Sequence, residues 1–127
     1  MLSKSDLINY FENGIKSTSE IKIGTEHEKF IYNKSDLSLV PYSGDVSINS
    51  IFEDFIKDGW TPVTESKNII ALNKDRASIT LEPGGQFELS GAPLKTIHET
   101  CKEINNHLAF TKKLDEKYNI GFLGLGF

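Results

Sequence analysis

Glutamates at alternating positions are the residues of this 127-residue chain with the clearest potential for chemistry. Residues 21–32 alternate in the manner of a strand, in which side chains two positions apart share a face. Glu26 and Glu28 therefore lie side by side. Gly24 precedes them on the same face and leaves space, whereas His27 points to the other side.

A second pair of glutamates flanks the turn formed by residues 83–85. Before the turn, apolar residues alternate with polar ones, so that Arg76 and Glu82 share the polar face of one strand. After the turn, Gln86 and Glu88 occupy the polar face of the next strand by the same alternation. If these strands and residues 21–32 share a sheet, four carboxylates line one surface.

Such a surface favours divalent cations. Like charges on neighbouring strands repel and lower stability unless a cation lies among them. Oxygen ligands prefer Mg²⁺, Mn²⁺ or Ca²⁺ to Zn²⁺. The surface would hold Mg²⁺ and bring in the phosphates of ATP, with the metal neutralising charge during phosphoryl transfer. The alternative is a solvated polar face whose carboxylates contact only water.

The elements that position these glutamates have an α+β pattern, an antiparallel sheet with helices covering one face. Strands are expected at residues 21–32, 60–63, 68–72, 76–82, 86–90 and 119–127. Helices are expected between residues 3 and 14, at 47–58 and from residue 96. Pro83-Gly84 suits the central pair of a type II turn, which requires a positive φ at Gly84.

The long helix begins with a capping box, Thr96-x-x-Glu99. The predicted apolar face of this helix consists of Ile97, Cys101, Ile104, Leu108, Thr111 and Leu114. Cys101 is then a packed thiol, and His98 and His107 are surface or cap residues. Trp60 is expected in the core.

Length and composition indicate one globular domain over residues 1–127. A net charge of −4 argues against a nucleic-acid partner, whose phosphates are neutralised by Lys and Arg. No apolar run approaches the roughly 20 residues that cross a bilayer, so no membrane contact is expected. One cysteine excludes an internal disulfide, and the N-terminus lacks the apolar core of a signal peptide, so a cytoplasmic protein is expected.

Two segments resemble a known group of enzymes. Residues 23–30 resemble the G-x-E-x-E strand that opens the carboxylate–amine ligases of the glutamine-synthetase-like fold. Residues 79–94 resemble the signature of the glutamate–cysteine ligases of plants and many proteobacteria, and residues 96–101 also fit. Members of that family are several times longer. The resemblance therefore implies a truncated, N-terminal part of such a catalytic domain.

The resemblance implies a reaction. ATP phosphorylates the γ-carboxylate of glutamate, and the amine of cysteine attacks the acyl phosphate to give γ-glutamylcysteine, ADP and phosphate, the first step of glutathione synthesis. By the same resemblance, Glu26 and Glu28 would be Mg²⁺ ligands, and Glu82 and Glu88 would be further ligands or substrate contacts. Two or three Mg²⁺ ions would be divided among these four glutamates.

Gln86 and Arg76 are additional candidates for substrate contact. In plant members of the family, disulfides regulate activity, and Cys101 resembles a position involved. Two alternatives stay open: a related γ-glutamyl ligase that uses another amine, and a remnant without catalysis that binds metal or a partner. Exposed strand edges would favour self-association. The chain alone is expected to be inactive, since most ATP contacts in the family lie later in the chain.

Overall fold

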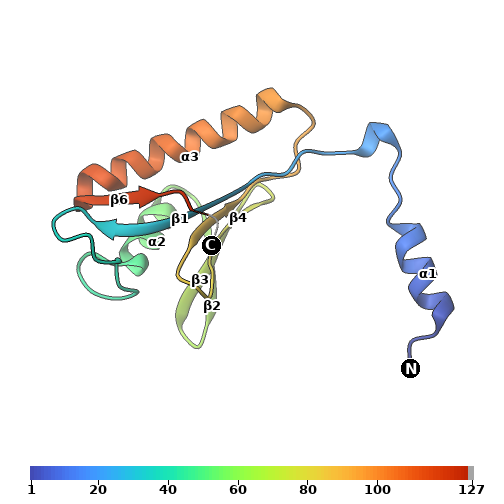
Figure 1. Ribbon diagram of the computed structural model, residues 1–127, viewed down its shortest axis with the longest axis horizontal. Helices are drawn as coiled ribbons and strands as arrows, with labels where there is room; N and C mark the ends of the chain where they lie inside the picture. The colour runs from blue at the N-terminus through green and yellow to red at the C-terminus, as the bar shows by residue number, and fades with distance from the viewer. Residues whose placement is uncertain (126–127) are drawn as a thin grey trace.

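The computed structural model describes residues 1–125, which form one six-stranded antiparallel sheet with helices (Figure 1). The helices are α1 (Lys4–Asn13), α2 (Ile48–Lys57), α3 (Ile97–Tyr118) and the short 3-10 helix η1 (Thr18–Glu20). The strands are β1 (Glu26–Asn33), β2 (Thr61–Glu65), β3 (Asn68–Lys74), β4 (Ala77–Leu81), β5 (Phe87–Ser90) and β6 (Ile120–Leu123). Their order across the sheet is β2-β3-β4-β5-β1-β6. The expected α+β class is confirmed.

Helix α2 fixes the centre of the core. Ser47 caps it, and its apolar residues recur with helical spacing, so that they form one buried face as predicted. Phe52 and Phe55 lie against Phe87 of β5, with ring centroids 5.7 Å apart in both pairs. The ring of Phe55 also packs against that of Phe110 of α3, with the two ring centroids 4.4 Å apart. These aromatic contacts join both helices to the same face of the sheet.

Helix α1 has the capping box expected from Ser3 and Asp6 and ends at Gly14. It stands apart from the sheet, and none of its residues is buried (Figure 1). The strand expected from residue 21 begins only at Glu26, since the segment before it makes a single isolated bridge from Ile23 to Leu94.

The hairpin between β4 and β5 differs from the predicted type II turn. The Gly85 N–H donates to the Glu82 carbonyl at 2.8 Å. Gly85 rather than Gly84 has the positive φ, +88°. Hairpin loops of three residues commonly consist of a type I turn followed by one residue in the left-handed region. Residues 83–85 fit this type of loop. The prediction therefore placed the required glycine one residue too early.

The buried face of α3 also differs from the prediction. Its buried residues are Thr100, His107, Thr111 and Leu114. Cys101 is exposed, so the expected packed thiol is wrong. His107 is buried instead of lying on the surface. Polar residues occupy the helix–sheet contact in the first half of α3, and a search for apolar periodicity misses such a face.

Strand β6 ends at Leu123, short of the predicted strand over residues 119–127, of which Gly126 and Phe127 lie outside the described residues. Tyr32 of β1 pairs with Gly121 of β6. A Cβ at Gly121 would be 2.3 Å from Cζ of Tyr32, so the ring lies directly over the glycine. Among residues 1–125, no helix has both the length and the apolarity required to span a membrane.

Candidate functional site

Two rows of polar side chains cross the sheet on the face opposite α2 and α3. In the first row Glu28 of β1 faces Glu88 of β5, which faces Thr80 of β4. In the second row Glu26 faces Ser90. Side chains that are directly opposite share a face, with Cβ atoms about 4.5–5.5 Å apart. The predicted polar surface on β1, β4 and β5 is present.

Two of the carboxylates are held by neighbouring hydroxyl groups. Ser90 Oγ donates to Glu88 Oε1 at 2.6 Å. Thr80 Oγ1 donates to Glu82 Oε1 at 2.8 Å, which links Glu82, beyond the end of β4, to the first row. Among residues 1–125 none of the four predicted glutamates forms an ion pair. Their negative charge is therefore uncompensated within this part of the chain.

Glu28 has the least satisfied carboxylate. Its Oε2 atom is buried and has no hydrogen-bond partner within residues 1–125. Glu88, another carboxylate, lies directly opposite. A buried polar atom without a partner is uncommon and requires an explanation, such as an ion that is not part of the chain. A divalent cation between Glu28 and Glu88 would remove both the repulsion and the missing contact.

The arrangement fits a partial magnesium site rather than a complete cage. No three His, Cys, Asp or Glu side chains within the described residues form a ready metal-binding group. Mg²⁺ in proteins commonly takes one or two carboxylates and completes its six ligands with water and substrate phosphates. The facing pair Glu28 and Glu88 meets that requirement. Glu26 is exposed at the start of β1 and is available beside the pair.

The two other predicted substrate contacts, Gln86 and Arg76, do not lie in the rows of glutamates. The side chain of Gln86 folds over the hairpin, so that a Cβ at Gly84 would be 2.3 Å from Gln86 Oε1. That oxygen is buried without a partner in the described part of the chain. Arg76 lies in the β3–β4 turn with φ +72°. It lies six positions before Glu82, about 20 Å along a strand, so the structure does not bring Arg76 to the glutamates.

A polar cluster lies on the other face of β1. Lys29 Nζ is 3.1 Å from His107 Nε2 of α3, and both side chains are buried. Burial lowers the pKa of Lys29 to about 8. Burial, with the nearby charges of Lys29 and His27, lowers the pKa of His107 to about 3. The sequence analysis did not predict this cluster. Lys29 is two positions from buried Ile31, so the two-residue period of a strand already places Lys29 on the core face.

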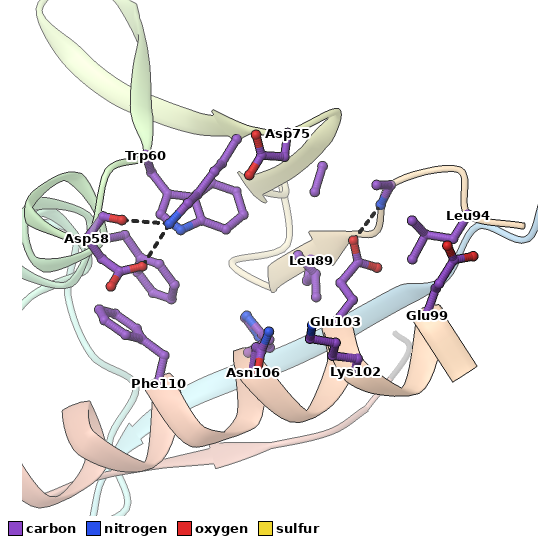
Figure 2. Close-up of a pocket in the computed structure, with 15 residues that line it drawn as sticks. Asp58, Trp60, Asp75, Leu89, Leu94, Glu99, Lys102, Glu103, Asn106 and Phe110 are labelled. Atoms are coloured by element: carbon purple, nitrogen blue, oxygen red, sulfur yellow. Dashed lines mark hydrogen bonds and ion pairs between the residues drawn. The ribbon is translucent and has the colours of Figure 1, made fainter. Parts of the chain in front are cut away.

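The same face carries a groove of about 390 Å³ between α3 and the sheet (Figure 2). Trp60 is half-buried and packs against the core beside Phe55, as expected, and it also forms part of the groove wall. Lys74 Nζ donates to the carbonyl and to Oδ2 of Asp58 at 2.6 and 3.0 Å, and lies 5.9 Å from the Trp60 ring centroid. Since its other walls include Leu89 and Phe110, the groove lies behind the sheet and is separate from the glutamate surface.

The family model for glutamate-cysteine ligase family 2 (GCS2) matches residues 22–127. The chain belongs to this family. It is 49% identical over 128 residues to the chloroplastic glutamate–cysteine ligase of Medicago truncatula, an alignment that covers 99% of this chain and 24% of the relative. The enzymes of the same name from Brassica juncea and Arabidopsis thaliana are 49% and 47% identical over 127 residues, with the same coverage. This family 2 chain spans about a quarter of the length of the relatives it matches.

The match covers every glutamate of the polar surface, whereas α1 and η1 precede the family model. The relatives' names contradict the expected cytoplasmic location, because each is named as chloroplastic. A single cysteine and an N-terminus without an apolar core distinguish secreted from internal proteins, but they do not distinguish the cytoplasm from an organelle.

Proposed function

We propose that this chain is part of an ATP-dependent glutamate–cysteine ligase. That enzyme joins the γ-carboxyl of L-glutamate to the amine of L-cysteine and yields γ-glutamylcysteine, ADP and phosphate, the first step of glutathione biosynthesis. The relatives' names and the family match support the reaction. The glutamate surface supports the site. The observation that carries the proposal is the facing pair Glu28 and Glu88, in which Glu28 Oε2 is buried and has no partner among residues 1–125.

The residues of the surface would have distinct roles. Glu28 and Glu88 would hold a Mg²⁺ ion, and Glu26 and Glu82 would be further ligands or substrate contacts. Bound Mg²⁺, as two or three ions, neutralises negative charge on the ATP phosphates. The strands hold the carboxylates at fixed spacing, so that the ions and phosphates meet preorganised ligands.

The open face of the sheet has a further consequence for the fold. Helices α2 and α3 cover one side of the sheet (Figure 1). On the other side no described helix or strand covers the glutamates, although Gly124 and Leu125, after β6, line a shallow hollow with Glu26 and Glu28. A glutamine-synthetase-like bowl has this arrangement, with a curved antiparallel sheet whose inner face binds metals and substrates. We assign β1 to β6 to part of such a bowl, in which ATP contacts would come from parts of the enzyme outside this chain.

Two other functions remain as competing hypotheses. A ligase with another amine acceptor would have the same metal surface, since that surface acts on glutamate and ATP. Comparison of amine acceptors with a full-length family member that contains this sequence separates the two. A remnant without catalysis would bind Mg²⁺ or a partner and take no part in ligation.

The test of the proposal is Mn²⁺ binding to the purified chain, measured as loss of the free-ion signal in electron paramagnetic resonance. Saturable binding is expected, and Glu28→Gln should weaken it by about tenfold, which corresponds to about 1.4 kcal/mol. Glu65→Gln is the matched control, because Glu65 is an exposed strand glutamate on β2, at the edge of the sheet. Absence of saturable binding, or equal losses for both variants, would overturn the proposal.

A further inference from the structure

Glu103 of α3 reaches across the groove to the sheet. Its Oε1 accepts a hydrogen bond from the Ala92 N–H, just after β5, at 2.9 Å. Figure 2 shows this carboxylate rising from α3, with one oxygen joined to a backbone nitrogen by a dashed line. The helix and the end of the strand are thus tied by a charge-assisted hydrogen bond, a stronger class than a bond between neutral groups.

The second oxygen of Glu103 occupies space that only a glycine leaves. A Cβ at Gly91 would be 2.3 Å from Glu103 Oε2 and 2.7 Å from Thr25 Oγ1. Real Cβ atoms do not approach so closely, so the carboxylate and the hydroxyl fill the position of the missing side chain. Both oxygens are buried and have no hydrogen-bond partner within residues 1–125. The close fit leaves little room for the Gly91 backbone to move.

This contact lies at the junction of the two strands that carry the facing glutamates. The Gly91 N–H donates to the Thr25 carbonyl at 2.7 Å. Thr25 immediately precedes Glu26, and the Glu28–Glu88 pair follows along the same ladder. Displacement of the junction would therefore change the spacing of β1 and β5 where the carboxylates must meet one ion.

We propose that Glu103 is a positioning residue for the glutamate surface, and that it acts through the backbone of Gly91 and Thr25. The inference rests on the proposed function, because it assumes that Glu28 and Glu88 bind a metal ion. Glu103 lies on the opposite side of the sheet from the ligands and touches none of them, so its effect is carried by the backbone of Gly91 and Thr25. Residues that do not contact a ligand can still change its binding through packed contacts.

The experiment compares Mn²⁺ affinity and amide exchange in the purified chain and two variants. Glu103→Ala removes the acceptor for the Ala92 N–H and should weaken Mn²⁺ binding by about tenfold. It should also speed hydrogen exchange at Gly91 and Ala92 in the metal-free protein. Glu103→Gln keeps an acceptor for Ala92 and places an N–H₂ donor beside Thr25 Oγ1. It should retain affinity within about threefold, a difference of less than about 0.7 kcal/mol.

Asp54→Asn separates positioning from general loss of stability. Asp54 ties α2 to α3 through Lys117 and Tyr118, far from the junction in sequence. This variant should unfold more easily than the parent yet bind Mn²⁺ with unchanged affinity. Parent-like affinity in Glu103→Ala, or an equal loss in Asp54→Asn, would overturn the positioning role alone. A parent chain that binds no Mn²⁺ would overturn the proposed function, and the inference would fall with it.

Discussion

Glu28 and Glu88 face each other across the β1–β5 ladder, and neither is paired with a cation among residues 1–125. Like charges at directly opposed positions of a sheet are destabilising, yet the structure surrounds Glu28 Oε2 with protein and gives it no donor in that part of the chain. The metal-free fold is therefore less stable because of this pair, and a bound metal ion would restore the lost stability. This coupling leads to a prediction on stability that does not depend on activity.

In metal-free buffer Glu28→Gln should raise the free energy of unfolding by about 0.2–1 kcal/mol, because it removes the repulsion with Glu88. With saturating MgCl₂ the order should reverse, since Mg²⁺ stabilises the parent more than the variant, which binds divalent ions about tenfold more weakly. Thermal unfolding followed by circular dichroism measures both. Glu65→Gln should show neither effect. The same order of stability with and without MgCl₂ would contradict a metal site at this pair.

Asp54 should make stability depend on pH in strongly acidic solution. Burial raises its pKa, but hydrogen bonds from Lys117, Lys57 and Tyr118 outweigh burial and hold the pKa at about 2. A depressed folded-state pKa gives stability that is complete above the unfolded value, near 4, and is lost as the pH falls toward 2. The contribution should be about 1–2 kcal/mol, because the lysines are largely exposed and solvent screens them.

Denaturant unfolding at pH 6, 4, 3 and 2 checks this prediction. Asp54→Asn should lower stability at pH 6 and flatten the decline below about pH 4. Asp115→Asn is the control, because Asp115 pairs with Lys34 at the surface, where ion pairs contribute about 0–1 kcal/mol. If the decline below pH 4 is as steep in Asp54→Asn as in the parent, the buried cluster is not its source.

The two edges of the sheet should differ in self-association. On β2, Pro62 and the irregular register at Val63 protect the edge from pairing. On β6, the strand Ile120–Leu123 is short but apolar and contains neither proline nor charge. We expect concentration-dependent dimers by sedimentation velocity, and Leu123→Lys should shift the chain to monomer. Val63→Lys should leave the distribution unchanged, and dimers that are insensitive to Leu123→Lys would contradict pairing through β6.

The chain alone should show no ligase activity. No described helix or strand closes over the glutamate face, whereas phosphoryl transfer relies on a closed, preorganised site. The assay is phosphate release that depends on both glutamate and cysteine. Release that requires both amino acids and disappears in Glu28→Gln would contradict this expectation. Release that persists in Glu28→Gln would indicate a contaminating enzyme.

The sequence correctly predicted the alternation of side chains along the strands and the capping of the helices. The polar face of β1 and β5 followed from the two-residue period, and Glu28 and Glu88 share a face as that period requires. The capping box at Thr96 also formed as expected. These features are local, since they depend on residues within one turn of helix or a few positions of a strand.

Contacts between distant elements were not readable. Lys29 and His107 are polar, and no apolar pattern indicates that they meet beneath the sheet. The contact of Glu103 with Ala92 could not be predicted from the sequence either, because it depends on where α3 crosses the end of β5. The turn after Glu82 was misassigned because either glycine satisfies the sequence rule for a positive φ. The hydrogen bond from Gly85 to Glu82 is common to both turns, and the positive φ at Gly85, +88°, decides between them.

The most direct test of the account is to locate a bound ion. Crystals of the chain soaked in MnCl₂ should give an anomalous scattering peak between β1 and β5, within bonding distance of Glu28 Oε2 and a carboxylate oxygen of Glu88. A saturated soak with no peak there, and with the two carboxylates turned away from each other into solvent, would contradict the central claim that this pair holds a divalent cation.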